Sequence, residues 1–245
     1  MIAAAGRKGQ GPGDFQNPIL IACFNKFVFI VDLNSSGIRI YDTDLKFVRS
    51  FTYPLPIYSF VALSENDLLV VTMGKSVFPP LARIDLRKSG VAEAGLSDFK
   101  PDAWWKFSGK ITTDQNGNIF YISSFEDIIA KFDPRGNLQW KKSLRSGEKS
   151  GEKTISTKLG PMTAPTEILY KDIAVDRKGR LFVMGGHKAV HRSRDIYVLN
   201  ENGDLIETLT LPEPTHILHF DKNGDLFVSA NEGATIKKYR LEDKK

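Results

Sequence analysis

A short turn signature that recurs along the chain constrains its fold more than any other feature. Three copies are clear and read Asp114-Gln-Asn-Gly117, Asp176-Arg-Lys-Gly179 and Asp221-Lys-Asn-Gly224, each followed by an apolar run. Aspartate and glycine at these positions favour a tight turn between two strands, because glycine tolerates positive φ. The chain is therefore expected to repeat one hairpin-based unit.

Weaker copies and a second turn complete the repeat. Ser64-Glu-Asn-Asp67 and Phe24-Asn-Lys-Phe27 are degenerate copies of the first turn. The second turn lies further along each unit, as in Phe132-Asp-Pro-Arg-Gly136 and Leu199-Asn-Glu-Asn-Gly203. Four strands per unit, repeating every roughly 40 to 50 residues, is the blade spacing of a β-propeller. The sequence predicts an all-β fold, a β-propeller of four-stranded antiparallel blades, with five blades visible.

The blade boundaries follow from these turns. The predicted blades span about residues 18–52, 58–96, 111–144, 172–211 and 217–241. The fifth blade lacks an outer strand, and an unpaired third strand would expose backbone donors and acceptors. We therefore expect Ile2–Ala5 to close the propeller as the missing strand. A single domain over residues 1–245 is expected, because propellers of this length usually form one unit.

A glycine-rich connector precedes the first blade. The stretch Gly6–Phe15 has too many glycines for a helix or central strand, so we expect it to cross a surface with Phe15 as its anchor. Its segment Gly-Gln-Gly-Pro-Gly-Asp-Phe, with Val31-Asp-Leu-Asn34 and Ile38-Arg-Ile-Tyr-Asp42, resembles the bacterial six-bladed β-propeller family related to NHL-repeat proteins. The resemblance implies six blades, one more than the repeats show. It also implies an exported protein, although Met1–Ala5 lacks the charged start of a secretion signal.

Composition narrows the classes of partner. No apolar run reaches 18 residues, so no membrane span is expected. The net charge of +5 is spread along the chain among acidic residues, which argues against nucleic acid as a partner. Cys23, the one cysteine, lies in an apolar run and is expected to be a buried small hydrophobe.

One face of the predicted propeller gathers the candidate binding residues. Loops between the second and third strands, and crossings between blades, converge on that face. The candidate ligand-binding residues there are Trp104, Trp105, Phe125, Glu126, Asp127, His187, His191, Arg192, Asn231 and Glu232. The tryptophan pair is either a recognition surface or packing between blades two and three. A protein, peptide or glycan is the partner that such a face predicts. The sequence indicates no oligomeric state.

Signs of catalysis are weak. His187 and His191 have the spacing of two metal ligands on a helix, but they lie in a loop and no glutamate follows the first, which favours a solvated loop. His216 and His219 flank an apolar strand, where packing or capping is expected. No nucleophile motif, phosphate loop or metal set is recognised, so no catalytic residue, metal or cofactor is predicted. The alternative is a metal-dependent hydrolase or lyase at the central channel, using these loop histidines, His216, Glu126 or Asp127.

A repeated polar segment separates blades three and four. Ser146–Thr154 contains Ser-Gly-Glu-Lys twice, which predicts a flexible exposed loop. Gly147 and Gly151 are accordingly expected to tolerate side chains, unlike the turn glycines. The basic residues around this segment are Lys141, Lys142, Arg145, Lys149 and Lys153. Glu148 and Glu152 interrupt them, so an RNA-binding rim is not expected.

Overall fold

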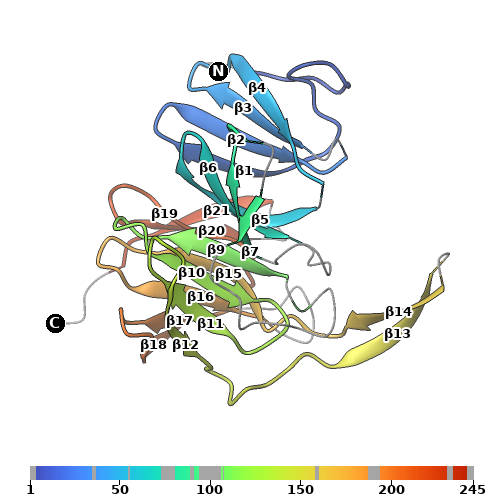
Figure 1. Ribbon diagram of the computed structural model, residues 1–245. Coiled ribbons are helices and arrows are strands. Elements are labelled where there is room, and N and C mark those ends of the chain that lie inside the picture. Colours follow the sequence, from blue (N-terminus) through green and yellow to red (C-terminus); the bar gives the residue numbers. More distant parts are fainter. Residues whose placement is uncertain are drawn as a thin grey trace. The chain divides into compact units, whose positions relative to one another are not determined.

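The protein is an all-β chain of propeller blades. The computed structural model describes residues 4–34, 37–54, 56–72, 81–88, 91–93, 106, 108–157, 160–186, 194–230 and 234–241. The described residues form strands and turns without an α-helix, and no helix among them is long and apolar enough to cross a membrane. The chain divides into two compact units, Met1–Ser97 and Asp98–Lys245 (Figure 1).

Unit 1 contains blades one and two. Blade one consists of β1 (Pro18–Phe24), β2 (Phe27–Asp32), β3 (Gly37–Asp42) and β4 (Phe47–Thr52). Blade two consists of β5 (Ile57–Ser64), β6 (Asp67–Thr72), β7 (Leu81–Asp85) and β8 (Val91–Glu93). Each is an antiparallel sheet whose strand order follows the chain. The two sheets pack through one apolar cluster that includes Phe29, Ile38 and Leu68.

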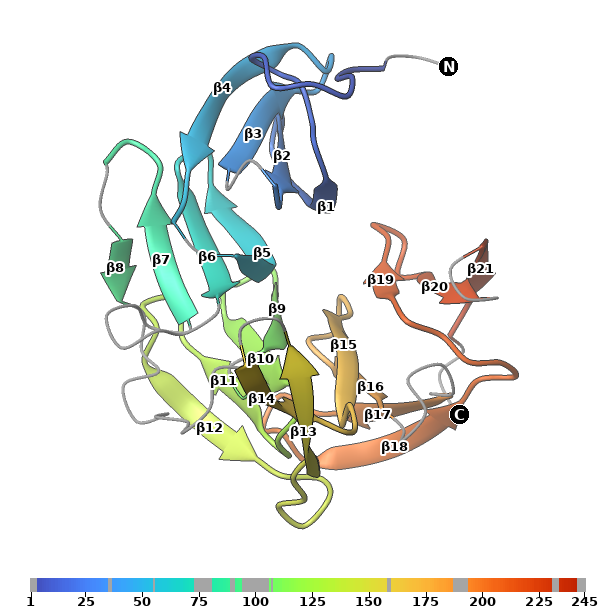
Figure 2. The ribbon, with the colours of Figure 1, turned by 90° about the vertical axis from the view of Figure 1, so that its right-hand side faces the viewer.

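Unit 2 contains blades three to five and a hairpin. Blade three consists of β9 (Gly109–Thr113), β10 (Ile119–Ser123), β11 (Ile129–Phe132) and β12 (Leu138–Lys142). Blade four consists of β15 (Tyr170–Val175), β16 (Leu181–Gly185), β17 (Asp195–Leu199) and β18 (Leu205–Thr210). Blade five has three described strands, β19 (Leu218–Phe220), β20 (Leu226–Ala230) and β21 (Thr235–Tyr239). Between blades three and four, β13 (Glu152–Thr157) and β14 (Gly160–Pro165) form a separate two-stranded sheet (Figure 2).

The strands lie where the sequence predicts them, because the buried strands can be recognised in the sequence by their apolar residues. The second strands, such as β10 and β16, are buried at every position, so they read as continuous apolar runs. Their side chains fill the space between consecutive sheets of unit 2, in one cluster around Phe120 and Val183 and in another around Phe182 and Val228. The five predicted blades and their antiparallel strands are confirmed. A sixth blade is not confirmed.

The glycines of the three clear turns adopt the positive φ that the sequence predicts. Gly117, Gly179 and Gly224 have φ of 78°, 76° and 83°, where residues with a Cβ are strained. The preceding aspartate folds back onto the turn: Asp114 Oδ1 accepts hydrogen bonds from the amides of Asn116 and Asn118, both at 2.9 Å. The side chain and the glycine together hold each hairpin, which confirms the register of the repeat.

The N-terminal connector lies on blade one. The ring of Phe15 is 5.8 Å from that of Tyr41, whose hydroxyl donates to the Gly13 carbonyl at 2.6 Å. The fully buried Asp32 accepts the amides of Gln16 and Asn17 at 2.8 and 2.9 Å. Phe15 therefore anchors the connector, as predicted. The buried carboxylate of Asp32, which was not predicted, also holds the connector on blade one.

The structure contradicts the predicted burial of Cys23 and does not test the predicted closure of the propeller by the N-terminus. The prediction that Cys23 is buried is wrong, because alternation along β1 turns Leu20, Ala22 and Phe24 to the core and leaves Cys23 exposed beside Ile21. The closing strand lies mostly outside the described residues, and Ala4 and Ala5, which are described, are not in a strand. Closure by the N-terminus and a single domain over the whole chain stay predictions.

Candidate functional site

A buried aspartate organises the loop after β10. Asp127 is 3% exposed, and its carboxylate accepts the amides of Leu144, Arg145 and Gly147 at 2.9, 2.6 and 2.9 Å. The hydroxyl of Tyr170 also donates to it. Burial, followed by the hydrogen bond to Asp127, raises the pKa of Tyr170, so this phenol remains a proton donor. Four donors use the carboxylate fully.

These bonds join two loops into one surface. The Asp127 carbonyl accepts from Ser143 Oγ at 2.7 Å, and its amide donates to the Glu148 carbonyl at 3.0 Å. Ser150 N donates to the Phe125 carbonyl at 2.9 Å. We call the joined segments 123–128 and 143–151 the platform. Its backbone is held at both ends of each loop, so its shape is set before any ligand binds.

The platform contains three of the predicted binding residues. Phe125 and Glu126 are partly buried on its surface, whereas Asp127 lies beneath it. Asp127 therefore shapes the site, because its oxygens already have donors. The other predicted binding residues, Trp104, Trp105, His187, His191, Arg192, Asn231 and Glu232, lie outside the described residues, and their role stays a prediction.

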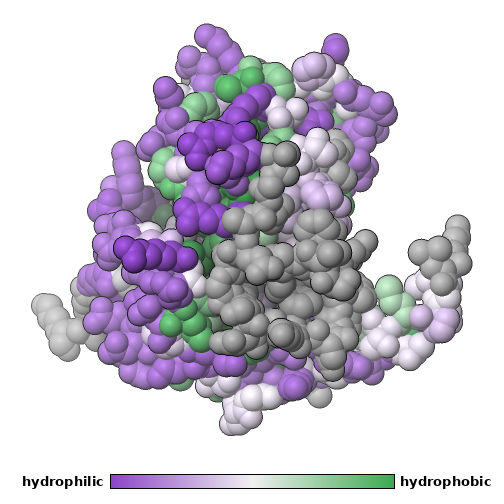
Figure 3. All heavy atoms as spheres, viewed as in Figure 1, coloured by the Kyte–Doolittle hydropathy of each residue, from purple (hydrophilic) through white to green (hydrophobic). Residues whose placement is uncertain are grey.

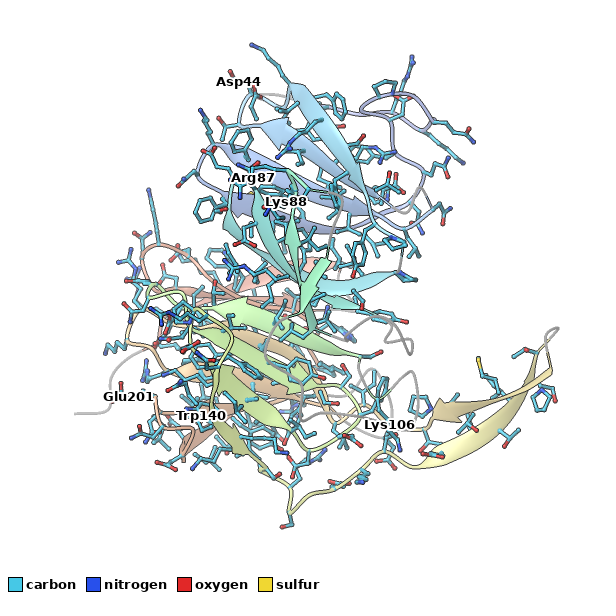
Figure 4. All side chains as sticks on the ribbon, in the orientation of Figure 1. Asp44, Arg87, Lys88, Lys106, Trp140 and Glu201 are labelled. Carbon is cyan, nitrogen blue, oxygen red and sulfur yellow. The ribbon has the colours of Figure 1, made fainter. Side chains whose placement is uncertain are left out.

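A β-hairpin extends from the platform. It consists of β13 and β14, and we call it the arm. Thr166 N donates to the Gly151 carbonyl at 2.9 Å, and Lys106 Nζ lies 3.6 Å from Glu152 Oε1 at the base of the arm (Figure 4). The prediction that Ser146–Thr154 is a flexible loop is wrong, because Asp127 fixes its start and β14 pairs with its end.

The basic residues near the platform do not form a free cationic rim. Lys142 Nζ is 3.0 Å from Asp204 Oδ1, and Arg145 Nε is 3.4 Å from Glu148 Oε2. Exposed pairs of this kind contribute little to stability, but they reduce the net charge that a polyanion would meet.

Sequence reasoning missed a cluster of ionisable groups on the innermost strands of unit 2. Asp172 on β15 accepts the amide of Leu218, in blade five, at 2.8 Å. Burial raises the pKa of Asp172 to about 6, while its backbone hydrogen bonds and the charges of Lys110 on β9 and His219 on β19 oppose that rise. The adjacent charged residues Lys171 and Asp172 on an inner strand were the signal available in the sequence.

A second cluster lies at the opposite ends of the same strands, around the turns. A cavity of about 210 Å³ lies between the turns that begin at Asp114 and Asp176, with Lys131 and Glu201 on its wall. The Glu201 carbonyl accepts from Trp140 Nε1 at 3.0 Å (Figure 4). The two aspartates are occupied by their own turns, so the cavity is a polar hollow rather than an acidic site. Among the described residues no group of three histidine, cysteine, aspartate or glutamate side chains is placed to hold a metal.

Comparison with known proteins supports the fold alone. No protein-family model and no curated protein sequence matches the chain. A streptogramin B lyase structure is similar over 94% of this chain and 85% of its own, with 17% identity and a TM-score of 0.51. A DUF4221 family member from Bacteroides vulgatus is similar over 91% and 75%, with 11% identity and a TM-score of 0.60.

A virginiamycin B lyase from Staphylococcus aureus is similar over 93% of this chain and 85% of its own, with 15% identity and a TM-score of 0.50. Identities this low establish a shared architecture and no shared activity. The similarity agrees with the β-propeller fold.

Proposed function

We propose that the protein is a non-enzymatic binding module that receives a protein or peptide partner on the platform. The observation that supports this function is the saturation of Asp127, which fixes two loops in one arrangement. Binding then requires little ordering of the backbone, so less of the interaction free energy is lost. Loops held by a rigid β-scaffold are the usual place for recognition in this kind of fold.

The surface groups of the platform suit a polypeptide. Phe125 supplies an aromatic ring, and Glu126 supplies a partly buried carboxylate. Aromatic side chains are enriched at protein interfaces, and a charged group beside one selects a partner of complementary charge. Asp127 takes no part in contacts with the partner, because its oxygens are occupied.

An enzymatic function remains the second candidate, and the inner-strand cluster favours it. A carboxyl group with a pKa of about 6 beside an imidazole and an ammonium group fits general acid–base chemistry near neutral pH. The residues of this candidate are Asp172, Lys110 and His219. It differs from the loop-histidine site that the sequence suggested, because it needs no metal.

Peptide and glycan arrays probed with the purified protein test the proposal. A peptide that binds the wild type should lose at least tenfold in affinity with Phe125→Ala/Glu126→Lys, through loss of the anchor and reversal of the charge. The matched control is Gln115→Ala/Asn116→Lys, which makes the same kind of change at an exposed turn. Equal binding by both double variants would contradict the platform as the site. A glycan as the sole ligand would contradict the class of partner.

Activity assays separate the two candidates, and metal analysis tests the metal-dependent site that the sequence suggested. We expect no turnover with a panel of ester, lactone and lyase substrates. Turnover that Asp172→Asn abolishes would replace the binding module with the enzyme. A stoichiometric metal in the purified protein would instead indicate a site among residues outside the described ranges.

A further inference from the structure

The arm has no core of its own. Its six residue pairs run from Glu152 opposite Pro165 to Thr157 opposite Gly160, and all of the paired residues are exposed or partly exposed. Figures 1 and 3 show it standing out from the sheets of its unit. A two-stranded hairpin alone is only marginally stable in water, whereas three or more strands with an apolar face suffice. The arm therefore gains from any additional strand.

Two prolines make the edges of the arm unequal. Pro161 and Pro165 lie within β14, and a proline has no N–H to give to the strand beside it. Both are paired with β13 in an unbroken register, so their positions must be those whose N–H would face outward. The outer edge of β14 is thus short of donors, and prolines protect an edge in this way.

The same register leaves the edge of β13 open. The residues opposite the outward positions of β14 are Ser156, Thr154 and Glu152, so these three direct their N–H and C=O groups away from β14. No described strand pairs with that side of β13. The run Thr154-Ile-Ser-Thr157 contains three β-branched residues and no proline, which favours pairing with a further strand.

We propose that a second copy of this chain pairs with this edge, β13 against β13, antiparallel about a two-fold axis. Two arms then form a continuous four-stranded sheet. This pairing goes beyond the proposed function and does not depend on it. In the register that places Ile155 opposite Ile155 of the second copy, Thr154 and Ser156 form hydrogen-bonded pairs, as their outward groups require.

The side chains of the arm complement themselves in this register. Ile155 and Met162 are cross-strand partners on one face, so two arms align four apolar side chains in one stripe. Met162 is 37% exposed in the single chain and would be partly covered. Lys153 faces Thr157 of the second copy, and no like charges are opposite each other among the described residues. A self-complementary edge is what an isologous interface requires, which favours a second copy over an unrelated strand.

Sedimentation at low and high protein concentration tests the pairing with two proline variants. Thr154→Pro removes an outward N–H from the β13 edge, whereas Thr163→Pro removes one from the opposite edge with the same demand on the arm's own ladder. We expect dimers at high concentration for the wild type and Thr163→Pro, and monomers for Thr154→Pro. A monomeric wild type, or equal association of both variants, would overturn the proposal.

A register-specific disulfide tests the pairing without altering the backbone. In a Cys23→Ser background, Ile155→Cys places two thiols opposite each other in a non-hydrogen-bonded pair, with Cα atoms about 4.5 Å apart. Mild oxidation should then yield a covalent dimer on a non-reducing gel. Lys153→Cys is the control, because its partner is Thr157 rather than itself. Equal cross-linking of the two variants, or none at residue 155, would overturn the register and the proposal.

Discussion

The innermost strands of the two units differ in chemistry although their blades share one architecture. In unit 1, β1 and β5 contain no charged residue and no histidine. In unit 2, β9, β15 and β19 contain Lys110, Lys171, Asp172 and His219. Apolar strands suffice to build a blade, so the charged groups of unit 2 are not a requirement of the fold. The burial of Lys171 and Asp172 has a free-energy cost that indicates a use other than packing.

Lys171 illustrates that cost. Its side chain is 8% exposed, and its Nζ has no hydrogen-bond partner among the residues that the structure describes. Burial lowers its pKa accordingly. It lies at the irregularity in the pairing of β15 with β16, between Tyr170 and Asp172. Unit 1 has no equivalent of this lysine on its inner strands.

The loops and turns of the units differ too. Each unit fixes a crossing with a buried aspartate, but Asp32 has the guanidinium of Arg39 at 3.9 Å, whereas Asp127 has the hydroxyl of Tyr170. Unit 2 places glycine at positive φ in its hairpin turns, while unit 1 uses Asn25 and Leu45 at φ of 50° and 59°. Unit 2 therefore differs from unit 1 both in the residues at positive φ in its hairpin turns and in the side-chain partner of its buried aspartate.

The largest expected effect is that of Asp127→Ala on stability. The substitution leaves three backbone amides without their acceptor and should lower the free energy of unfolding by about 3 to 5 kcal/mol. Chemical denaturation measures the change. Glu126→Ala, one residue away and only partly buried, is the control and should cost less than about 1 kcal/mol. Similar losses for the two variants would mean that the platform is not held by Asp127.

The inner-strand difference predicts an opposite sign for Asp172→Asn. The folded pKa of Asp172 is about 6 against an ordinary 3.8, so the folded state binds this proton more tightly than the unfolded chain does. Stability from this group is therefore present at low pH, falls as pH rises from about 4 to about 6, and is absent above.

Asparagine removes that dependence while its carbonyl can still accept from Leu218 N. Urea unfolding should show Asp172→Asn to be about 1 to 3 kcal/mol more stable than the wild type at pH 7, with the difference shrinking towards pH 4. The wild type and the variant would have parallel pH profiles if Asp172 were an ordinary surface carboxyl group.

Turn glycines provide the next comparison. Gly179→Val should cost about 1 to 2 kcal/mol, because φ there is 76° and no neighbour lies within 4 Å of an added Cβ to add a clash. Gly147 was expected from the sequence to tolerate a side chain, but its φ is 75° with equally open surroundings, so Gly147→Val should cost the same. Thermal melts decide between the two expectations, and an unchanged melting temperature for Gly147→Val would favour the flexible loop.

Gly147 also illustrates which part of the structure could not be predicted from the sequence. The blades could be predicted because alternation, buried runs and Asp-x-x-Gly turns are local patterns that the packing reinforces. The platform could not, since the bonds from Asp127 to Leu144 and Tyr170 join residues 17 and 43 positions away. The repeated Ser-Gly-Glu-Lys segment is predicted to be flexible from its sequence, because the Asp127 carboxylate that accepts the hydrogen bond of its Gly147 amide is distant along the chain. Phe125, Glu126 and Asp127 were correctly placed in one loop, but the structural role of Asp127 depends on contacts that no local pattern encodes.

The smallest effect concerns the turns of unit 1. Leu45→Asn should gain about 0.5 kcal/mol, because asparagine tolerates positive φ better than leucine does, and Asn25→Leu should lose a similar amount. Both changes are measured by the shift of the denaturation midpoint at constant slope. Changes of the same sign in both variants would show that packing, rather than backbone strain, distinguishes these turns from those of unit 2.

Hydrogen exchange of individual amides tests the platform most directly. The amides of Leu144, Arg145 and Gly147 should be protected in the wild type, because each donates to the Asp127 carboxylate. In Asp127→Ala they should exchange at least tenfold faster, while the amide of Gly179, bonded within its own turn, keeps its rate under native conditions. Unchanged protection at all three amides in the variant would contradict the claim that one buried aspartate shapes the binding surface.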